Sequence, residues 1–519
     1  MSTGPDIGPA LALALHEVGH AGQDVLDAVL HVVARYLGVE HRVLARDQLD
    51  VGVQGAGEAV AYLGLRLEHV QARPVGHDLE LHVVLALLLN TGAVANPPST
   101  VLVMTDDQGW GDTGYNGHPH LKTPNLDKLA REGVRFDRFY AAHFNCSPTR
   151  GSVLTGRHPN RYGTFSPGAP IRAQEITIAQ VAKSAGYATG HFGKWHLNGV
   201  RGPGQPIPKE DPLHPGRLGF DEWVSASNFI DLDTRLARNG ASEQFEGDSS
   251  DSITDEALKF IRRSAKDAKP FLALVWFGSP HSPHRALAKD RETYKHLPEK
   301  DQHYYGELTA VDRSVGRLRE ALRELGAVDE AILWFCSDNG GAFGPLSTGH
   351  LRGTKGTLWE GGVRVPGLLE WPGRVKSPVT TNVPCSTSDI FPTLLEAMGA
   401  KSSDPARPLD GISLLPLIEG KVTAREKPIA FWDHRSDHAT LIAWPWKLHQ
   451  KPITGKRRRK SDDAFPTVLL YDLSKDPKET IDLADQDPER VARMELALTS
   501  WQESVKKSFA GGDYPRAPK

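Results

Sequence analysis

Apolar runs alternate with amphipathic stretches along most of the chain. Residues 100–105 form a strand-like apolar run, and FLALVWFG and AILWFCS form two later ones. Between such runs, PNLDKLAREG has helical spacing, with Pro124 near its start and Gly133 at its end. Strands that alternate with helices predict an α/β fold, with a large, mostly parallel sheet flanked by helices on both faces.

Polar side chains follow four of these strand-like runs. The segment TIAQVAKSAGYATGHFGKW predicts a helix, a glycine stop and another strand. In open α/β sheets the ligand crevice lies beyond the carboxyl ends of the strands. The pattern therefore predicts one site assembled from distant parts of the chain, with the candidates Asp106, Asp107, Lys194, His196, His281, Asp338 and Asn339.

The pattern changes after about residue 430. Short apolar runs, ATLIAWPWKLH and TVLLYDL, precede a helical segment, ERVARMELALTSWQESVKK. They predict a smaller C-terminal subdomain, residues 431–519, built from an antiparallel sheet and a helix. The basic run Lys456–Lys460 is expected in a loop between two of these strands, either as a solvated tip or as a contact for a polyanionic substrate.

The first 95 residues differ in composition from the rest, since no lysine precedes Lys122 and no tryptophan precedes Trp110. The apolar run at 81–95 ends in Ala-Val-Ala, which is typical of a signal peptide and its cleavage site, and it is too short to span a bilayer. We expect residues 1–95 to be a poorly ordered extension or an over-long start. The protein that begins near Asn96 is then exported, to the periplasm or beyond the cell.

The same N-terminal stretch contains a rival signal, HEVGH. His16 and His20 would share one face of a helix, and Glu17 could activate a metal-bound water, as in zinc peptidases. The following residues lack the glycine and third histidine of the longer motif. A zinc peptidase is therefore a distant alternative.

The net charge and the cysteine content narrow the possible functions further. The formal net charge of −3 provides no global basic field of the kind that nucleic-acid-binding proteins use. The three cysteines cannot form a disulfide framework, and their spacing matches no zinc pattern. Cys336 falls in a strand-like run and is expected in the core, which leaves Cys146 to be explained.

Cys146 begins the segment CSPTRGSVLTG, which has the form Cys-x-Pro-x-Arg followed by Thr-Gly. This segment closely resembles the signature of the Cys-type sulfatases, which have an alkaline-phosphatase-like fold. Further similar blocks are DDQGWGD, GKWHL, GSPHSPH, SDNGG and GTKGTLWEGG, so the likeness runs from about Pro97 into the C-terminal region. It implies that residues 96–430 are the catalytic domain. It also implies that a formylglycine-generating enzyme converts Cys146 to formylglycine, whose hydrated aldehyde is the nucleophile.

The resemblance also implies roles for the other residues. A ligand set made only of oxygen donors, with no imidazole nitrogen and no thiolate, suits Ca²⁺, or Mg²⁺, better than zinc. Fixed cations stabilise charge that develops in the transition state, His281 can protonate the leaving oxygen, and His196 can take a proton from the hydrated aldehyde. The implied catalytic residues are Cys146, Arg150, Lys194, His196, His281 and Lys355, and the implied metal ligands are Asp106, Asp107, Asp338, Asn339 and the converted Cys146. His284 is expected to be a surface or supporting residue.

The predicted activity is that of a sulfatase, which hydrolyses an organic sulfate ester and releases inorganic sulfate. The substrate is a sulfated small molecule or glycan, and the polar segment 228–249, expected at the mouth of the site, favours a carbohydrate sulfate over an aryl sulfate. Two alternatives stay open. One is a formylglycine-dependent phosphodiesterase or phosphonate hydrolase, and the other is a non-catalytic sulfated-glycan binder in which Cys146 is never converted.

Overall fold

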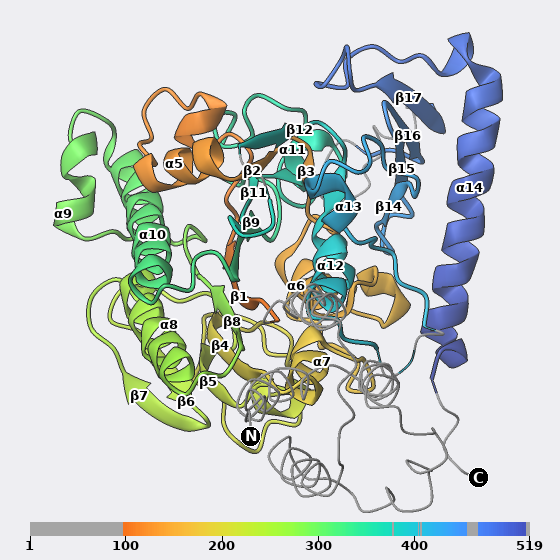
Figure 1. The fold of residues 1–519 in the computed structure, drawn as a ribbon. Helices are drawn as coiled ribbons and strands as arrows, with labels where there is room; N and C mark the ends of the chain where they lie inside the picture. Colours follow the sequence, from red (N-terminus) through yellow and green to blue (C-terminus); the bar gives the residue numbers. More distant parts are fainter. Residues whose placement is uncertain (1–96, 376–377, 403, 405–406, 454–465, 515–519) are drawn as a thin grey trace, which may run out of the picture. The chain divides into compact units, whose positions relative to one another are not determined.

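A computed structural model describes residues 97–375, 378–402, 404, 407–453 and 466–514 (Figure 1). Three features of the sequence lie outside these residues: the HEVGH segment, the apolar run at 81–95 and the basic run Lys456–Lys460. The expectations for them stay predictions, as does the division of the chain at residues 95 and 430.

The sheet that carries the candidate residues has ten strands in the order β12-β2-β11-β9-β1-β8-β4-β5-β6-β7. The five strands β9, β1, β8, β4 and β5 run parallel, and antiparallel strands flank them. The bounds are β1 (Ser99–Thr105), β2 (Val134–Phe136), β4 (Ala188–Lys194), β5 (Glu222–Ala226), β6 (Arg235–Arg238), β7 (Ala241–Gln244), β8 (Phe271–Trp276), β9 (Ala331–Ser337), β11 (Gly367–Glu370) and β12 (Val379–Thr381).

Both faces of this sheet are buried at its centre, which is why the parallel strands β1, β8 and β9 are apolar without alternation. In β1, Leu102 and Met104 pack with residues of α6, α7 and α12, whereas Val101 and Val103 pack with residues of α5, α8 and α10. The helices are α5 (Pro124–Glu132), α6 (Cys146–Thr155), α7 (Ile178–Ser184), α8 (Ser249–Lys266), α9 (Ala288–Arg291), α10 (Glu299–Glu324), α11 (Glu360–Val363), α12 (Ile390–Ala397) and α13 (Leu415–Ile418).

Two smaller sheets complete the described fold. A three-stranded sheet has the order β10-β3-β13, and a four-stranded antiparallel sheet has the order β14-β15-β16-β17. Leu498 of the long helix α14 packs on the second sheet, and the helix runs along it in Figure 1. The bounds are β3 (Phe139–Tyr140), β10 (Arg364–Val365), β13 (Cys385–Ser386), β14 (Ile429–Trp432), β15 (Ala439–Ala443), β16 (Trp446–Gln450), β17 (Val468–Asp472) and α14 (Pro488–Lys507).

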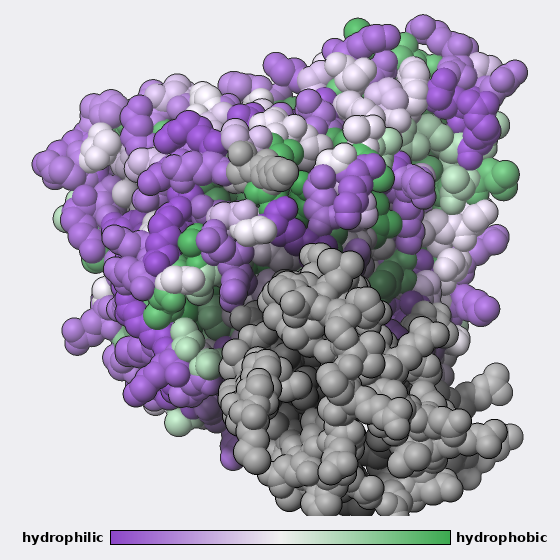
Figure 2. Space-filling model, in the orientation of Figure 1, coloured by the Kyte–Doolittle hydropathy of each residue, from purple (hydrophilic) through white to green (hydrophobic). Residues whose placement is uncertain are grey.

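The structure therefore confirms the predicted fold class, a mostly parallel sheet between helices with a small antiparallel sheet and helix at the C-terminal end. Cys336 is fully buried in β9, as expected for a core residue. No helix among the described residues is long and apolar enough to cross a membrane. On the face seen in Figure 2, hydrophilic residues predominate and hydrophobic ones form small scattered groups.

Candidate active site

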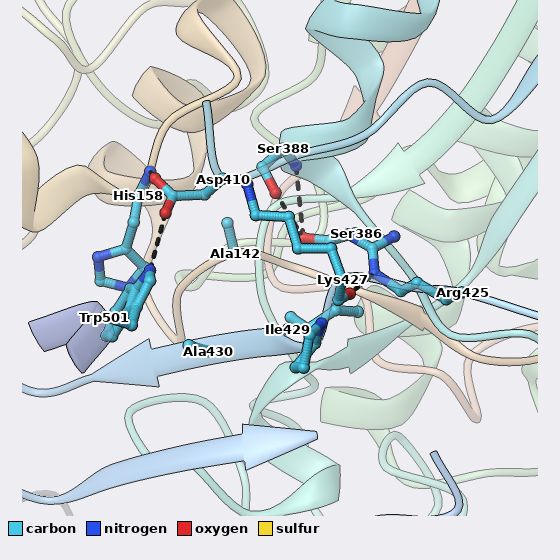
Figure 3. A pocket seen from close by; sticks show the side chains of 11 residues that line it. Ala142, His158, Ser386, Ser388, Asp410, Arg425, Lys427, Ile429, Ala430 and Trp501 are labelled. Carbon is cyan, nitrogen blue, oxygen red and sulfur yellow. Dashed lines mark hydrogen bonds between the residues drawn. The ribbon is translucent and has the colours of Figure 1, made fainter. Parts of the chain in front are cut away.

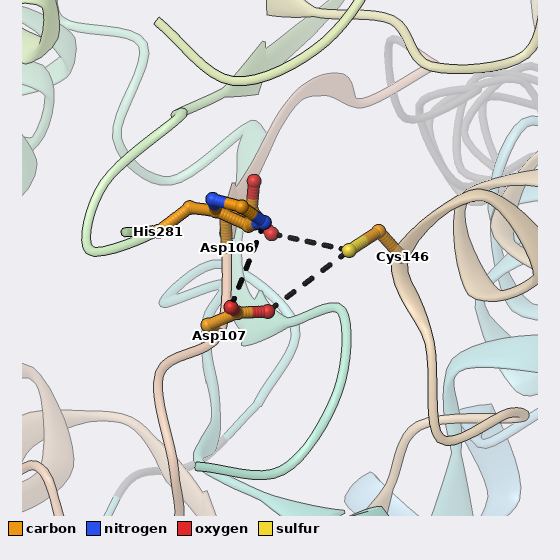
Figure 4. Close-up of side chains that lie close together, drawn as sticks. All are labelled: Asp106, Asp107, Cys146 and His281. Atoms are coloured by element: carbon orange, nitrogen blue, oxygen red, sulfur yellow. Dashed lines mark hydrogen bonds and ion pairs between the residues drawn. The ribbon is translucent and has the colours of Figure 1, made fainter. Parts of the chain in front are cut away.

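The central strand β1 ends at the candidate site. Asp106 and Asp107 follow it directly, and both are buried. Asp107 adopts a left-handed backbone conformation, with φ of 67°, which is uncommon outside glycine and is often found at functional sites. This turn at the end of the strand places the two carboxylates side by side, facing Cys146 (Figure 4).

The motif around Cys146 forms helix α6, which starts at that residue. Asn145 is extended and precedes the helix, and Pro148 lies in the first turn, where a missing backbone N–H breaks no intrahelical bond. Gly156 ends the helix in a left-handed conformation, with φ of 69°, so the Thr-Gly of the motif is a helix stop. The start of α6 thus holds the Cys146 thiol 3.4 Å from Asp106 Oδ1 and 3.9 Å from Asp107 Oδ1.

Two cations come from α6 and β4. The guanidinium of Arg150, one turn after Cys146, is fully buried and donates to Asp338 Oδ2 from Nε at 3.0 Å and from Nη2 at 2.8 Å. Its third nitrogen donates to the backbone oxygen of Lys194 at 3.1 Å. Lys194, at the end of β4, is fully buried and pairs with Asp106.

Two imidazoles lie beside this group. His281 follows β8 and places Nε2 3.8 Å from Asp107 Oδ2, with 19% of its side chain exposed (Figure 4). His196 follows β4, is 3% exposed, and has a buried Nδ1 with no hydrogen-bond partner among the described residues. Burial lowers the pKa of both histidines, so both imidazoles are neutral near pH 7.

The end of β9 and the loop after it complete the cluster. Asp338 Oδ1 accepts from the backbone N–H of Asp107 at 3.2 Å, and Asn339 Nδ2 donates to Asp107 Oδ1 at 2.9 Å. Lys355 lies with Nζ 3.4 Å from Cys146 Sγ and 2.5 Å from Asp107 Oδ1. The structure thus brings together every residue that the sequence nominated for the site, from six separate segments of the chain.

Charge in the cluster is balanced and strongly coupled. Burial alone would raise the pKa of Asp106, but Lys194, His281 and Arg150 outweigh burial and hold that pKa well below its usual range. Burial and the neighbouring Asp106 raise the pKa of Asp338 to about 7, although Arg150 opposes the shift. Burial, followed by the charge of Asp106, also raises the pKa of the Cys146 thiol.

The donor atoms suit a hard cation. Asn339 Oδ1 is buried without a hydrogen-bond partner among the described residues, next to two carboxylates. The ligand atoms of Asp106, Asp107, Cys146 and His281 all lie within 4.8 Å of one another, a grouping that differs from the predicted ligand set. We favour the set with Asp338 and Asn339, because Ca²⁺ and Mg²⁺ take oxygen ligands rather than an imidazole or a thiol.

A separate pocket lies between α14 and the chain that leads into β14 (Figure 3), lined by Ala142, His158, Ser386, Ser388, Asp410, Arg425, Lys427, Pro428, Ile429, Ala430 and Trp501. Its charged groups already pair with other side chains of the protein. Asp410 accepts from Trp501 Nε1 at 2.8 Å and from Arg161, while Arg425 pairs with Asp389 at 2.7 Å. None of the candidate site residues lines this pocket, so we assign the chemistry to the Cys146 cluster.

Sequence reasoning missed two neighbours of the site. Phe229 stacks on the His281 ring, with centroids 4.6 Å apart and planes 10° apart. Glu307 Oε2, on α10, lies 3.5 Å from Nδ1 of His284, a residue expected at the surface or in a supporting role. Phe229 does belong to the segment 228–249 expected at the mouth, but no pattern in the sequence distinguished Glu307 from the other polar positions of its helix.

Comparisons with known proteins agree with this geometry. The family model described as Sulfatase matches residues 98–400. N-acetylgalactosamine-6-sulfatase from Sus scrofa is 29% identical over 486 residues, which are 82% of this chain and 90% of that protein. Arylsulfatase A from Homo sapiens is 31% identical and covers 77% of this chain and 86% of its own length. The crystal structure of Ps i-CgsB in complex with k-i-k-neocarrahexaose has a TM-score of 0.69 at 27% identity, and covers 79% of this chain and 93% of that one.

Proposed function

The chain belongs to the sulfatase family and is a sulfuric ester hydrolase, and from that premise we propose that it removes sulfate from a carbohydrate with a formylglycine made from Cys146. The observation that carries this proposal is the convergence of Cys146 with carboxylates and cations beyond the strand ends. Cys146 Sγ lies 3.4 Å from both Asp106 Oδ1 and Lys355 Nζ.

The state of the thiol supports conversion of Cys146. Cysteine nucleophiles work as thiolates, and their pKa is lowered by nearby positive charge or a helix N-terminus. Burial and Asp106 instead raise the pKa of the Cys146 thiol, so the unmodified side chain is a poor nucleophile despite its place at the start of α6. Formylglycine supplies, through its hydrated aldehyde, a hydroxyl nucleophile at this position.

The cations support binding of a sulfate group. The cluster sets three carboxyl groups, Asp106, Asp107 and Asp338, against three cations, Arg150, Lys194 and Lys355. A divalent cation held by Asp106, Asp107, Asp338, Asn339 and the converted Cys146 would make the cluster net positive and polarise a sulfate oxygen. We propose Ca²⁺ for this place. With the carboxylates bound to a cation, Lys194 and Lys355 would be free to hold the sulfate oxygens while charge develops.

The two histidines suit proton transfer on opposite sides of the reaction. His281 is partly exposed beside Asp107, where the oxygen of the leaving alcohol can reach it, and we propose that it protonates that oxygen. His196 is buried and neutral, and its Nδ1 has no hydrogen-bond partner among the described residues. We propose that it accepts a proton from the hydrated aldehyde of the converted Cys146. The role of His196 requires a neutral imidazole, which burial provides. His281 must first take up the proton that it donates, and the charges of Asp106 and Asp107 favour this against the effect of burial.

A carbohydrate substrate is supported by the surroundings and by relatives. The segment 228–249 contributes Phe229 to the site, beside His281. The relatives include an N-acetylgalactosamine-6-sulfatase and a protein crystallised with an oligosaccharide, k-i-k-neocarrahexaose. A sugar large enough to contact the mouth of the site can bind the side chains of this segment, whereas a small aryl sulfate needs few of them.

The experiment is a sulfate-release assay on defined sulfated mono- and oligosaccharides, with an aryl sulfate and an aryl phosphodiester in parallel. We expect a sugar sulfate to have the highest kcat/KM. Faster turnover of the phosphodiester would favour a phosphodiesterase or phosphonate hydrolase instead. Binding of a sulfated glycan without any turnover, together with an intact Cys146 thiol, would favour a glycan-binding protein.

A further inference from the structure

Three loops at the carboxyl ends of parallel strands place aromatic side chains against His281 or His284. Phe229 follows β5, His284 lies three residues after His281 in the segment that follows β8, and Phe343 lies in the loop after β9. Phe229 and Phe343 are each partly buried, and 18% of the His284 side chain is exposed. These three residues form what we call the aromatic rim.

The rim adjoins the reacting groups. The Phe229 ring lies flat on His281, the proposed proton donor to the leaving oxygen, with centroids 4.6 Å apart. The charge of Asp107 acts on His284 and on Tyr304, which meets the His284 ring edge to face at 5.0 Å. Phe343 meets the same imidazole edge to face at 5.1 Å. We expect a group that leaves from the sulfate near His281 to pass these rings.

Two buried polar atoms face each other behind the rim. His284 Nδ1 and Glu307 Oε2 are 3.5 Å apart, and neither has a hydrogen-bond partner among the described residues. Burial of unsatisfied polar atoms costs about 1–3 kcal/mol each, so a pair of them needs an explanation. A small movement of the imidazole toward α10 would join them.

The hydrogen bonds of the fold do not by themselves require a glutamate at position 307. Its Oε1 accepts from the backbone N–H of Arg285 at 2.5 Å, a bond that the oxygen of a glutamine could make equally well. The side chain is 5% exposed, and burial raises the pKa of its carboxyl well above the usual range. The second oxygen is therefore directed at His284 at a cost in stability.

We propose that His284 is a substrate-contacting residue that selects the sugar, with its Nε2 hydrogen-bonded to a hydroxyl of the leaving sugar and its Nδ1 then closed onto Glu307. Phe229 and Phe343 provide apolar walls for the faces of the sugar ring. The inference rests on the proposed function, because it assigns the sugar side of the same site.

A hydroxyl fits this pair better than a second anionic group. Burial lowers the pKa of His284 to about 4, so its imidazole is uncharged near pH 7, and burial raises the pKa of Glu307, which favours the uncharged form of its carboxyl. A neutral imidazole can donate to or accept from a hydroxyl, according to which nitrogen carries the proton. Ligand pockets commonly combine aromatic walls with a few such polar groups that fix orientation.

The test compares kcat/KM for the best sugar sulfate with kcat/KM for an aryl sulfate, in the wild type and in variants. His284→Phe keeps the ring and removes both nitrogens, and we expect the sugar-to-aryl ratio to fall about tenfold. Glu307→Leu should lower the ratio as well, whereas Glu307→Gln keeps a neutral hydrogen-bonding partner and should stay within about threefold of wild type. His434→Phe, at an exposed histidine between β14 and β15, is the matched control and should leave the ratio unchanged.

Deoxy analogues of the sugar sulfate separate contact from structure. For one monodeoxy analogue, the wild type should lose about tenfold in kcat/KM and His284→Phe should lose nothing further, since the contact is already gone. Equal losses on the sugar and the aryl sulfate, or additive losses with every analogue, would overturn the inference. A wild-type protein that hydrolyses neither ester would overturn the proposed function and this inference with it.

Discussion

The Cys146 side chain is buried among charged groups rather than in the apolar core. Its thiol is 1% exposed and lies against Asp106, Asp107 and Lys355, so it contributes little apolar packing. We predict that Cys146→Ala reduces sulfate release by about 10³-fold or more while it changes the free energy of unfolding by about 1 kcal/mol or less. Assays of sulfate release and urea denaturation measure the two effects. A variant that keeps activity would remove Cys146 from the mechanism.

The carboxylates at the end of β1 make a second prediction at the residue scale. We expect the purified protein to bind one divalent ion per chain and its melting temperature to rise with added Ca²⁺, because ligands that bind only the folded state stabilise it. Asp107→Ala should abolish both effects, and activity with them. Asp437→Ala, in a half-exposed ion pair with Lys451, is the control and should bind metal normally. Elemental analysis that finds stoichiometric zinc, retained in Asp107→Ala, would contradict the assignment.

At the scale of elements, α11 ties the active site to the C-terminal sheet. The loop before α11 carries Lys355, and the backbone N–H of Gly356 in that loop donates to the oxygen of Phe144, two residues before Cys146, at 3.0 Å. Glu360, which begins α11, accepts from Lys447 Nζ of β16 and from the Tyr140 hydroxyl, each at 3.0 Å. The sheet therefore braces the segment that carries Lys355.

We predict that Lys447→Met lowers the free energy of unfolding by about 3–5 kcal/mol, because it leaves Glu360 and Glu479 buried without their shared cation. Adding Glu360→Gln should recover part of the loss. Lys451→Met, which breaks the half-exposed pair with Asp437, should cost less than about 1 kcal/mol. Urea denaturation gives these values, and a Lys447→Met change as small as that of the control would refute the bracing role.

The sequence predicted the long elements because each one repeats its pattern several times. The strand at 100–105 and the helix in PNLDKLAREG match β1 and α5 closely. The three-residue strand β2 and the two-residue strand β3 carry no readable alternation, so their pairing depends on contacts that only the folded chain provides. The three-stranded sheet β10-β3-β13 was therefore not predictable.

At the scale of the whole molecule, the candidate site was predictable from one topological rule. Asp106, Lys194, His281 and Asp338 follow parallel strands, and such strand ends meet at one edge. The contact between His284 and Glu307 was not predictable in the same way. It depends on how the segment after β8 packs against α10. The sequence alone does not show that a glutamate on an amphipathic helix is buried.

The position of the site within the chain makes a prediction about its first 95 residues. Every residue proposed for catalysis or metal binding lies between Asp106 and Lys355. A chain that begins at Asn96 should therefore fold and hydrolyse sulfate esters with a kcat/KM within about twofold of the full chain. We also propose that the native host exports the protein, with processing near Asn96, which N-terminal sequencing of the exported protein checks. An insoluble or inactive shortened chain, beside an active full-length one, would show that the missing residues are part of the fold.

The central claim is that Cys146 becomes formylglycine and that catalysis depends on the converted residue. Mass spectrometry of the tryptic peptide from Phe139 to Arg150, taken from protein of measured activity, tests this claim most directly. We predict the mass of the peptide with an aldehyde in place of the thiol, in a fraction that rises in proportion to specific activity across preparations. A fully active preparation in which that peptide carries only an intact cysteine would contradict the account.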